Sequence, residues 1–229
     1  MSKFREPNEI EMKNSHHNAV LWDLDGTIVD SAPYHKLAWH DTFSGWGINF
    51  TEDVHRFSLG RRNNEIIRRY MGSKMSQREV DLIAEQKEEK FREYIKDDIN
   101  PCPGVVEIIE SLASAEVPLA IVSSATIENI RLITEKLHIN SFFNLFVTGK
   151  DVIHGKPNPQ GFLMAANKLR VEPRHCIVIE DAVAGVGAAE NCGMYCIAVT
   201  NTCSKQDLAE ADIVVDRLDE LKELWPIDI

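Results

Sequence analysis

The chain has 229 residues, of which 44% are apolar and 27% are charged, a composition typical of a folded globular protein. This length suffices for one α/β domain with a small insertion, and the composition argues against a disordered chain, a fibre or a disulfide-stapled miniprotein. The formal net charge of −11 argues against nucleic acid or an anionic membrane as a partner, because both attract basic surfaces.

The first residues of the chain are not expected to form a signal peptide. Residues 1–17 are polar and charged throughout and lack the apolar stretch of a signal peptide, so we expect a flexible N-terminal tail. No apolar run approaches the ~20 residues that a membrane span needs. The five cysteines form no metal-binding or disulfide pattern, which favours reduced thiols and a cytoplasmic location. The sequence carries no signal for an oligomeric state.

The first predicted element is a buried strand. Residues 19–22 (AVLW) are apolar, and residues 23–27 (DLDGT) predict a tight turn directly after them. The next segment shows amphipathic helical patterns and no convincing strand, with helices predicted at 33–46, 61–72 and 76–96. Residues 97–103 are rich in turn-forming residues and predict a linker.

From Pro103 onwards the pattern alternates between helices and short apolar strands. Helices are predicted at 104–115, 126–138, 158–170 and 182–191, and a last one near the C-terminus. Strands are predicted at 118–122, 145–148, 176–179, 195–199 and, at the edge, 213–215. Continuous apolar strands separated by helices indicate a parallel sheet that is covered on both faces. We therefore expect a doubly wound α/β core (residues 18–30 and 101–229) with a helical cap (residues 31–100) inserted after the first strand.

Polar side chains follow the carboxyl ends of these strands, where ligands bind in doubly wound folds. They are carboxylates, hydroxyls, an amide and one lysine: Asp23, Asp25, Thr27, Ser123, Ser124, Lys156, Glu180, Asp181, Thr200, Asn201 and Thr202. Clustered carboxylates need a counter-charge, and a hard divalent cation such as Mg²⁺ prefers oxygen ligands. Lys156 and Ser123 could bind a phosphoryl group, with Asp23 as nucleophile and Asp25 as general acid and base.

Other interpretations of the same residues are weaker. DLDG lacks the third acid and the later glutamate of a calcium-binding EF-hand loop. Gly185-Val186-Gly187 lacks the third glycine of a dinucleotide fingerprint, and an acidic pair before it would repel a pyrophosphate. Taken alone, Glu180-Asp181 could cap a helix, and Lys156 could be a solvated lysine.

In their order along the chain, these segments resemble the motifs of the haloacid dehalogenase (HAD) superfamily. The four motifs are matched by Asp23-Leu24-Asp25-Gly26-Thr27, by Ser123, by Lys156 and by Glu180-Asp181. The helical insertion resembles the cap of the group that contains β-phosphoglucomutase and many sugar-phosphate phosphatases. The stretch from Asp30 to His35, together with Trp39, is similar to a motif of that group.

The resemblance implies a role for each matching residue. Asp23 would form an aspartyl-phosphate, and Asp25 would act first as general acid and then as base. Mg²⁺ would be held by oxygen ligands: Asp23, the backbone carbonyl of Asp25, Asp181 and, through water, Glu180. Phosphoryl oxygens would be bound by side chains and backbone amides: Ser123, Lys156, Leu24, Asp25 and Ser124. A dehalogenase is disfavoured, because that branch lacks the second aspartate of the first motif.

The cap is expected to set specificity, with three candidate residues for contacting the substrate: His35, Arg61 and Arg62. The chain departs from the mutase pattern at three positions that carry a basic residue in the mutases: Leu59, Asn63 and Thr126. The absence of these three basic side chains weakens the capture of a second phosphate. We therefore expect an Mg²⁺-dependent phosphatase that acts on a small phosphorylated metabolite, with a sugar phosphate favoured.

Two alternatives stay open. A phosphohexomutase of the β-phosphoglucomutase type would use the same core motifs. A non-enzymatic domain that resembles a response-regulator receiver would also combine clustered acids with a hydroxyl and a lysine, although receivers are shorter and carry no cap. For the phosphatase and for the mutase alike, the expected partner is a small molecule. Neither nucleic acid nor a membrane is expected as a partner.

Overall fold

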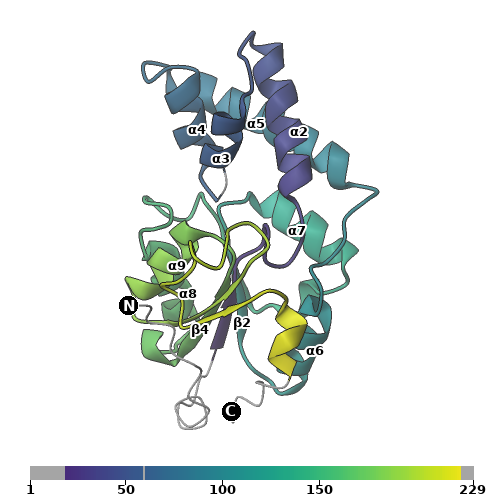
Figure 1. Cartoon of the computed structure of the whole chain (residues 1–229), viewed down its shortest axis with the longest axis vertical. Helices are drawn as coiled ribbons and strands as arrows, with labels where there is room; N and C mark the ends of the chain where they lie inside the picture. The colour runs from purple at the N-terminus through teal and green to yellow at the C-terminus, as the bar shows by residue number, and fades with distance from the viewer. Residues whose placement is uncertain (1–18, 59, 223–229) are drawn as a thin grey trace.

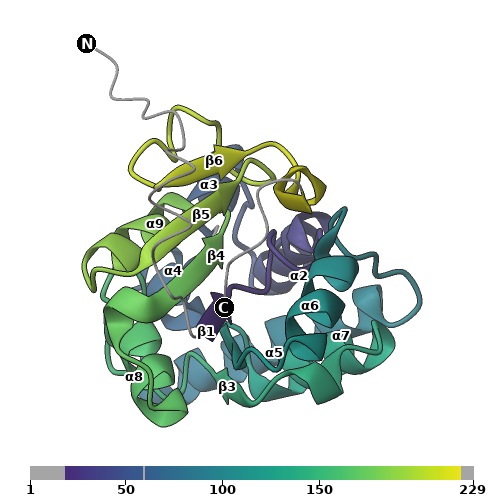
Figure 2. The same ribbon diagram turned by 90° about the horizontal axis from the view of Figure 1, so that it is seen from below.

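A computed structural model describes residues 19–58 and 60–222 of the chain. The strands of this part form one sheet: β1 (Ala19–Trp22), β2 (Leu119–Val122), β3 (Leu145–Val147), β4 (Cys176–Glu180), β5 (Tyr195–Val199) and β6 (Ile213–Val215). They lie in the order β3-β2-β1-β4-β5-β6, and every neighbouring pair is parallel. Figure 2 shows the strands side by side, seen from below.

Each face of the sheet has its own hydrophobic core, because successive side chains of a strand point to opposite faces. Val20 and Trp22 of β1 belong to one core, and Ala19 and Leu21 belong to the other. The helices cover the two faces in pairs: α6 (Val105–Ser114) with α7 (Ile127–Lys136), and α8 (Gln160–Leu169) with α9 (Val183–Glu190). A strand covered on both faces can be apolar along its whole length, as AVLW is.

The segment between β1 and α6 forms a second, helical layer above the sheet (Figure 1). We call its helices the cap: α2 (Ala32–Gly45), α3 (Glu52–Ser58), α4 (Asn63–Tyr70) and α5 (Gln77–Ile95). The cap has a core of its own that includes Trp39, Phe43 and Ile83. The doubly wound α/β fold with a helical cap inserted after the first strand is thereby confirmed. The expected domain boundaries, 30/31 and 100/101, stay predictions.

Helix α3 has no counterpart among the predicted elements. With seven residues it is too short to show an amphipathic pattern. Thr51 nevertheless provides a start signal, since its Oγ1 accepts a hydrogen bond from the Val54 amide at 3.4 Å. Two acids, Glu52 and Asp53, occupy the first turn, where the helix dipole favours negative charge.

The described part of the chain ends in a short helical element. After β6 the described part ends in the 3-10 helix Leu218–Lys222, which lies where a last helix was expected. Residues 1–18 and 223–229, and with them the predicted N-terminal tail at 1–17, lie outside the described residues. Within the described ranges, no helix combines the length and the apolarity that a membrane span needs.

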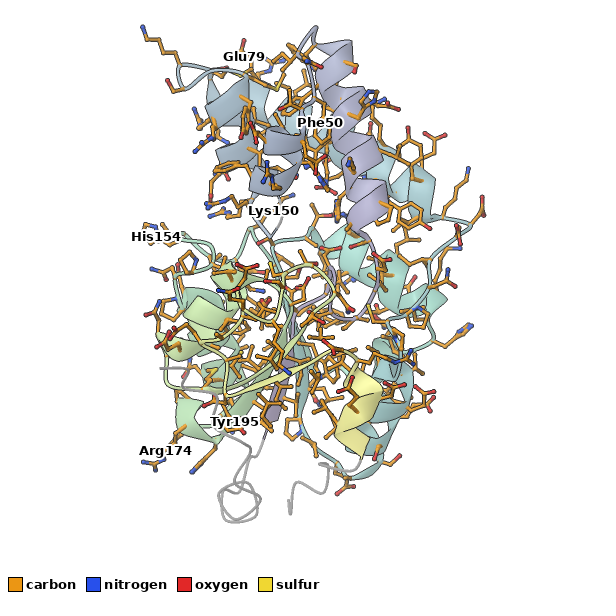
Figure 3. The ribbon with its side chains drawn as sticks, viewed as in Figure 1. Phe50, Glu79, Lys150, His154, Arg174 and Tyr195 are labelled. Atoms are coloured by element: carbon orange, nitrogen blue, oxygen red, sulfur yellow. The ribbon has the colours of Figure 1, made fainter. Side chains whose placement is uncertain are left out.

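The strand order places a ligand crevice next to β1. From β1 the chain runs outwards through β2 and β3, and then to the other side through β4, β5 and β6. Loops that leave β1 and β4 therefore diverge at their carboxyl ends, which opens a crevice there. In Figure 3, His154 lies at the end of the core that faces the cap, and Tyr195, the first residue of β5, lies at the opposite end. The carboxyl ends of the strands thus face the cap.

Candidate active site

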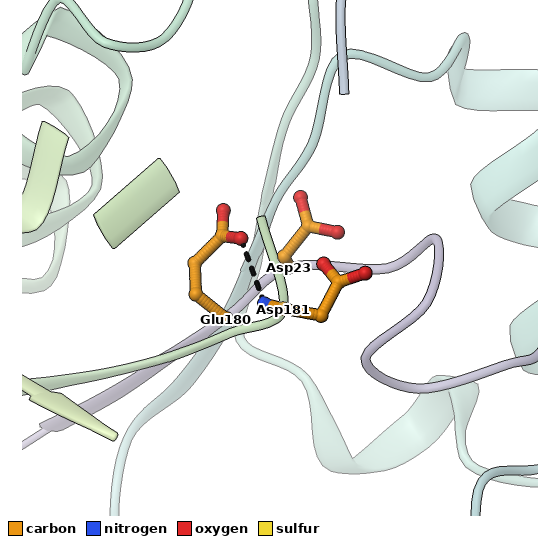
Figure 4. A group of neighbouring side chains, drawn as sticks. All are labelled: Asp23, Glu180 and Asp181. Atoms are coloured by element: carbon orange, nitrogen blue, oxygen red, sulfur yellow. Dashed lines mark hydrogen bonds between the residues drawn. The ribbon is translucent and has the colours of Figure 1, made fainter. Parts of the chain in front are cut away.

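Carboxylates meet at the carboxyl ends of β1 and β4. Asp23, Glu180 and Asp181 each place one oxygen within 4.8 Å of the others, and among the described residues they are the group with this metal-ligand geometry. All are buried, with exposed fractions of 8% for Asp23, 1% for Glu180 and 2% for Asp181. Figure 4 shows the side chains next to one another, with the Asp181 amide donating to Glu180 Oε2 at 3.0 Å.

Lys156 lies between two of these carboxylates. Its Nζ donates to Asp23 Oδ1 and to Glu180 Oε1, both at 2.5 Å. Burial by itself would lower the pKa of Lys156, but the charges of Asp23 and Glu180 outweigh burial and raise it above its ordinary value. The lysine is therefore a permanent cation at the base of the site.

One ammonium does not compensate the charge of the cluster. Burial raises the pKa of Asp23 to about 7, a rise that Lys156 opposes and that the charges of Glu180 and Asp25 reinforce. Burial, together with the charges of Glu180 and Asp23, also raises the pKa of Asp181 well above its ordinary range. A further cation between these carboxylates would favour their ionised forms.

The cluster fits a hard divalent cation. Asp181 Oδ2 is buried and has no hydrogen-bond partner within the described part of the chain. Gly26, at φ +87°, leaves the space beside this oxygen open, because a Cβ there would lie 1.9 Å from Asp181 Oδ2. At Gly185 a Cβ would lie 1.8 Å from Cδ of Glu180. The donors are carboxylate oxygens, which suit magnesium better than soft metals.

The Asp25 side chain is held by residues of the cap. Its Oδ1 accepts from Ser31 Oγ at 2.6 Å and lies 3.0 Å from His35 Nε2. Lys87 Nζ lies 2.7 Å from His35 Nδ1, and since an ammonium only donates, the ring proton lies on Nε2 and is donated to Asp25. Burial would raise the pKa of Asp25, but His35 and Ser31 bind its charged form and lower the pKa to about 2.

Two buried charges of the cap support this contact. Lys87 is 2% exposed and donates to Glu88 Oε1 at 2.9 Å. His35 stacks on Phe91 with ring centroids 3.9 Å apart and planes 5° from parallel. The charged run of α5 predicts a solvated face, so the sequence interpretation missed both Lys87 and Glu88. A signal was present, because Lys87 continues the i, i+3, i+4 spacing of the buried residues Val80, Ile83 and Phe91.

The structure gathers most of the predicted site residues around one pocket. Its lining includes core and cap residues: Asp23, Asp25, Ser123, Ser124, Lys156, Glu180, Asp181, His35 and Arg61. The Leu24 side chain is fully buried in the core, so only its backbone is available to a ligand. Arg62 is not part of this lining: its Nη1 donates to the Ile153 carbonyl oxygen at 2.9 Å. Leu59 lies outside the described residues.

Helix α3 adds pocket residues that the sequence interpretation missed. His55 and Ser58, one turn apart, both line the pocket. His55 Nδ1 lies 3.3 Å from Glu52 Oε1, while its Nε2 is buried without a hydrogen-bond partner among residues 19–58 and 60–222. Ser58 Oγ donates to the His55 carbonyl oxygen at 2.7 Å, which leaves its lone pairs for other donors. Because α3 was not predicted, the side chains of His55 and Ser58 were not placed at the pocket; the start signal at Thr51 could have indicated the helix.

These features define a class of protein: a doubly wound α/β core with an acidic cluster and a half-buried lysine at its switch point, under a helical cap. Residues 20–199 match the family model described as haloacid dehalogenase-like hydrolase, and the chain belongs to this family. The resemblance drawn from the sequence motifs is confirmed, as is the expectation of a hydrolase of this superfamily.

Curated relatives and solved structures agree with this membership. The chain is 31% identical to validoxylamine A 7'-phosphate phosphatase of Streptomyces hygroscopicus subsp. limoneus, over 92% of this chain and 97% of the relative. It is 33% identical to hexitol phosphatase A of Escherichia coli (strain K12), over 88% and 91% of the two chains. A crystal structure of β-phosphoglucomutase from Clostridium difficile is similar with a TM-score of 0.80 and 28% identity, over 90% and 93% of the two chains.

Proposed function

We propose that the protein is an Mg²⁺-dependent phosphatase that hydrolyses a small phosphorylated metabolite, with a sugar phosphate favoured. Family membership and the relatives named phosphatases support the reaction class. The buried oxygen cluster of Asp23, Glu180 and Asp181 supports a divalent cation. Asp23, the Asp25 backbone carbonyl and Asp181, with Glu180 through water, would hold Mg²⁺, which when bound neutralises charge on the phosphoryl oxygens.

The residues of the chain divide the chemistry between them. Asp23 attacks phosphorus and forms an aspartyl-phosphate, while Lys156, at 2.5 Å, favours its ionised form and binds a phosphoryl oxygen. Ser123, Ser124 and the backbone amides after β1 bind the remaining phosphoryl oxygens. Water then attacks the aspartyl-phosphate and releases inorganic phosphate, which regenerates Asp23.

Asp25 supplies the proton transfers. It gives a proton to the leaving oxygen in the first step and takes one from water in the second. With its pKa lowered to about 2 in the ligand-free protein, Asp25 is ionised, which is the form that the base of the second step requires. For the first step it must be protonated, and an arriving phosphate promotes this, because a second negative charge nearby raises the pKa of a carboxyl.

A buried carboxylate between cap and core favours a phosphatase over a mutase. A mutase of the resembling type must capture a second phosphate, and Asn63 stands where its pattern has an arginine. Here Asn63 Nδ2 donates to Glu88 Oε1 at 2.6 Å. The pKa of Glu88 is lowered, because the charge of Lys87 and its other partners outweigh the effect of burial. Glu88 is paired with Lys87 at 2.9 Å, so this part of the pocket lining offers no net positive charge to capture a second phosphate. This is the observation on which the choice of phosphatase rests.

The expected partners follow from the same site. The substrate is a small molecule that fits beneath the cap, and neither nucleic acid nor a membrane is expected as a partner of so acidic a chain. All five cysteines, which lie within the described ranges, are unpaired, and this supports the cytoplasmic location inferred from the sequence.

The test is a panel of hexose and pentitol phosphates, assayed with Mg²⁺, with and without a hexose bisphosphate. We expect inorganic phosphate to be released without bisphosphate, and the release to be lost in Asp23→Asn and in EDTA. Formation of a sugar-phosphate isomer without matching phosphate release would instead support the mutase. An inert protein that still binds Mg²⁺ would support a receiver-like domain.

A further inference from the structure

Asn201, in the loop after β5, is bonded to the turn that carries the first motif. Its Nδ2 donates to the Gly26 carbonyl oxygen at 2.7 Å, across 175 positions of sequence. The Gly26 amide donates to the Val29 carbonyl oxygen at 2.8 Å. Both polar backbone groups of Gly26 are therefore held: the amide in the peptide that joins Gly26 to Asp25, and the carbonyl in the peptide that joins it to Thr27, so both planar peptides have little freedom to turn.

The loop of Asn201 is itself anchored to the edge of the sheet. The Thr200 amide donates to the Val215 carbonyl oxygen at 3.0 Å, and Thr200 Oγ1 donates to Asp216 Oδ1 at 2.9 Å. These bonds fix the start of the loop relative to β6. Asn201 thus connects a rigid strand edge to a turn that comes from the other end of the chain.

The next residue of the loop contacts the other half of the acidic cluster. The Thr202 hydroxyl contacts the Asp181 carboxylate, and both residues line the pocket. Gly26, Thr202 and Asp181 lie close together, since a Cβ on Gly26 would lie 2.6 Å from Thr202 Oγ1 and 1.9 Å from Asp181 Oδ2. Consecutive residues therefore hold the turn after β1 and the carboxylate after β4 at a set distance from each other.

We infer that Asn201 is a positioning residue for the metal site: by binding the Gly26 carbonyl oxygen it holds the Gly26–Thr27 peptide, and with it the turn in which Asp23 and the Asp25 carbonyl face Asp181. Because a cation at this cluster is part of the proposed function, the role of Asn201 rests on that function. Without the amide, the Gly26 carbonyl oxygen keeps, within the described part of the chain, a weak contact with Cys102 Sγ at 3.8 Å. The turn after β1 then gains conformational freedom, which metal binding must remove again. The affinity of the site for Mg²⁺ therefore falls.

A matched control separates positioning from a general loss of stability. Asn144 also makes a side chain to backbone hydrogen bond, in which its Oδ1 accepts from the Leu119 amide at 2.8 Å. Leu119 is the first residue of β2, so this bond lies at the opposite end of the sheet from the acidic cluster. Removal of this hydrogen bond should weaken the fold without displacing the metal ligands, which lie at the other end of the sheet.

The experiment titrates the metal-free full chain with Mg²⁺ in a calorimeter and measures unfolding by urea in parallel. The variants are Asn201→Ala, Asn201→Leu, which is close to asparagine in shape but has no donor, Asn144→Ala and Asp181→Asn. We expect Asp181→Asn to abolish Mg²⁺ binding and both Asn201 variants to weaken it about tenfold or more, as is typical for the loss of an outer-shell contact. Asn144→Ala should bind Mg²⁺ like the wild type, although it unfolds at lower urea.

The outcomes distinguish this inference from the function on which it rests. If both Asn201 variants bind Mg²⁺ as the wild type does while Asp181→Asn does not, the positioning role is overturned and the proposed metal site stands. If Asn144→Ala weakens Mg²⁺ binding as much as Asn201→Ala does, the effect is one of general stability and the positioning role is again overturned. If the wild type binds no Mg²⁺, the metal site fails, and the role of Asn201 with it.

Discussion

Glu88 of the cap and Asn129 of the core form a buried hydrogen bond across the boundary between the two layers, with Asn129 Nδ2 donating to Glu88 Oε2 at 2.6 Å. Arg92 Nη1 donates to Oδ1 of the same asparagine at 3.2 Å, so α5 engages both atoms of one amide. Asn129 lies in the first turn of α7, where the helix dipole also favours a carboxylate. The cap is therefore docked on the core by Glu88, whose neighbour Lys87 bonds the histidine that holds Asp25.

Replacement of Glu88 tests this docking by its pH dependence. The pKa of Glu88 in the folded protein lies below the ordinary value of 4.5: burial acts to raise it, but Lys87, His35 and Asn63 outweigh burial. A lowered pKa means that ionised Glu88 stabilises the fold above pH 4.5, and that this contribution is lost as the pH falls through the folded-state pKa. We expect Glu88→Gln to lower the free energy of unfolding by about 3 kcal/mol at neutral pH.

Urea denaturation at neutral pH and below pH 4.5 provides the measurement. The difference between wild type and Glu88→Gln should shrink at the lower pH. Glu85→Gln is the control, because Glu85 also belongs to α5 and pairs with Arg92 but is 56% exposed. A difference for Glu88→Gln that is the same at both pH values would show that its ionisation does not stabilise the docked cap.

Two glycines of α9 should respond in opposite ways to alanine. At Gly187 a Cβ would lie 3.5 Å from Cβ of Pro157, an ordinary contact, so the better helix propensity of alanine should raise the free energy of unfolding by ~0.5–1 kcal/mol. At Gly185 the added Cβ would overlap the Glu180 carboxylate, so we expect lower stability and weaker Mg²⁺ binding. Thermal unfolding and Mg²⁺ titration of both variants check this, and equal stabilisation by both alanines would contradict the packing of Glu180 on Gly185.

Asp25→Asn should separate the two proton transfers through the choice of leaving group. With a sugar phosphate, whose leaving oxygen needs a proton, we expect turnover to fall by about 10²–10⁴-fold. With p-nitrophenyl phosphate, whose phenolate leaves without a proton, the first step should survive. Stopped-flow absorbance should then show a burst of nitrophenolate followed by slow turnover, since the second step still lacks its base.

Circular dichroism should report an unchanged fold for Asp25→Asn, and Asp53→Asn, on the exposed surface of the cap, serves as a charge-matched control. Wild-type turnover of a sugar phosphate by Asp25→Asn would remove Asp25 from the acid–base role.

The neighbouring arginines of the cap should have different effects. Arg61 lines the pocket and lies over the Phe57 ring at 4.4 Å, so Arg61→Ala should raise KM for a phosphorylated substrate about tenfold, the loss of one charge-assisted contact. Arg62 contacts the Ile153 backbone, so Arg62→Ala should change KM less. Steady-state kinetics of both variants provide the measurement. A larger KM effect for Arg62→Ala would reverse the assignment.

Much of the core could be predicted because its signals are local. AVLW is apolar along its whole length because both faces of β1 are covered, and the same requirement produces CIVI and YCIAV in β4 and β5. The carboxyl ends of parallel strands meet at one edge, so Asp23 and Asp181 could be placed together from the order of strands and helices alone.

The cap side of the pocket depends on contacts that no local pattern encodes. Lys87 and Glu88 stand in a charged run that is typical of a solvated helix face, yet they are buried, because α5 packs on α2 and Glu88 reaches Asn129, 41 positions away. His55 lies on a helix too short to show a period. The sequence by itself thus determined the sheet, the acidic cluster and the family. Only the tertiary structure decided which cap charges face the pocket, since burial of a charge depends on partners supplied from distant parts of the chain.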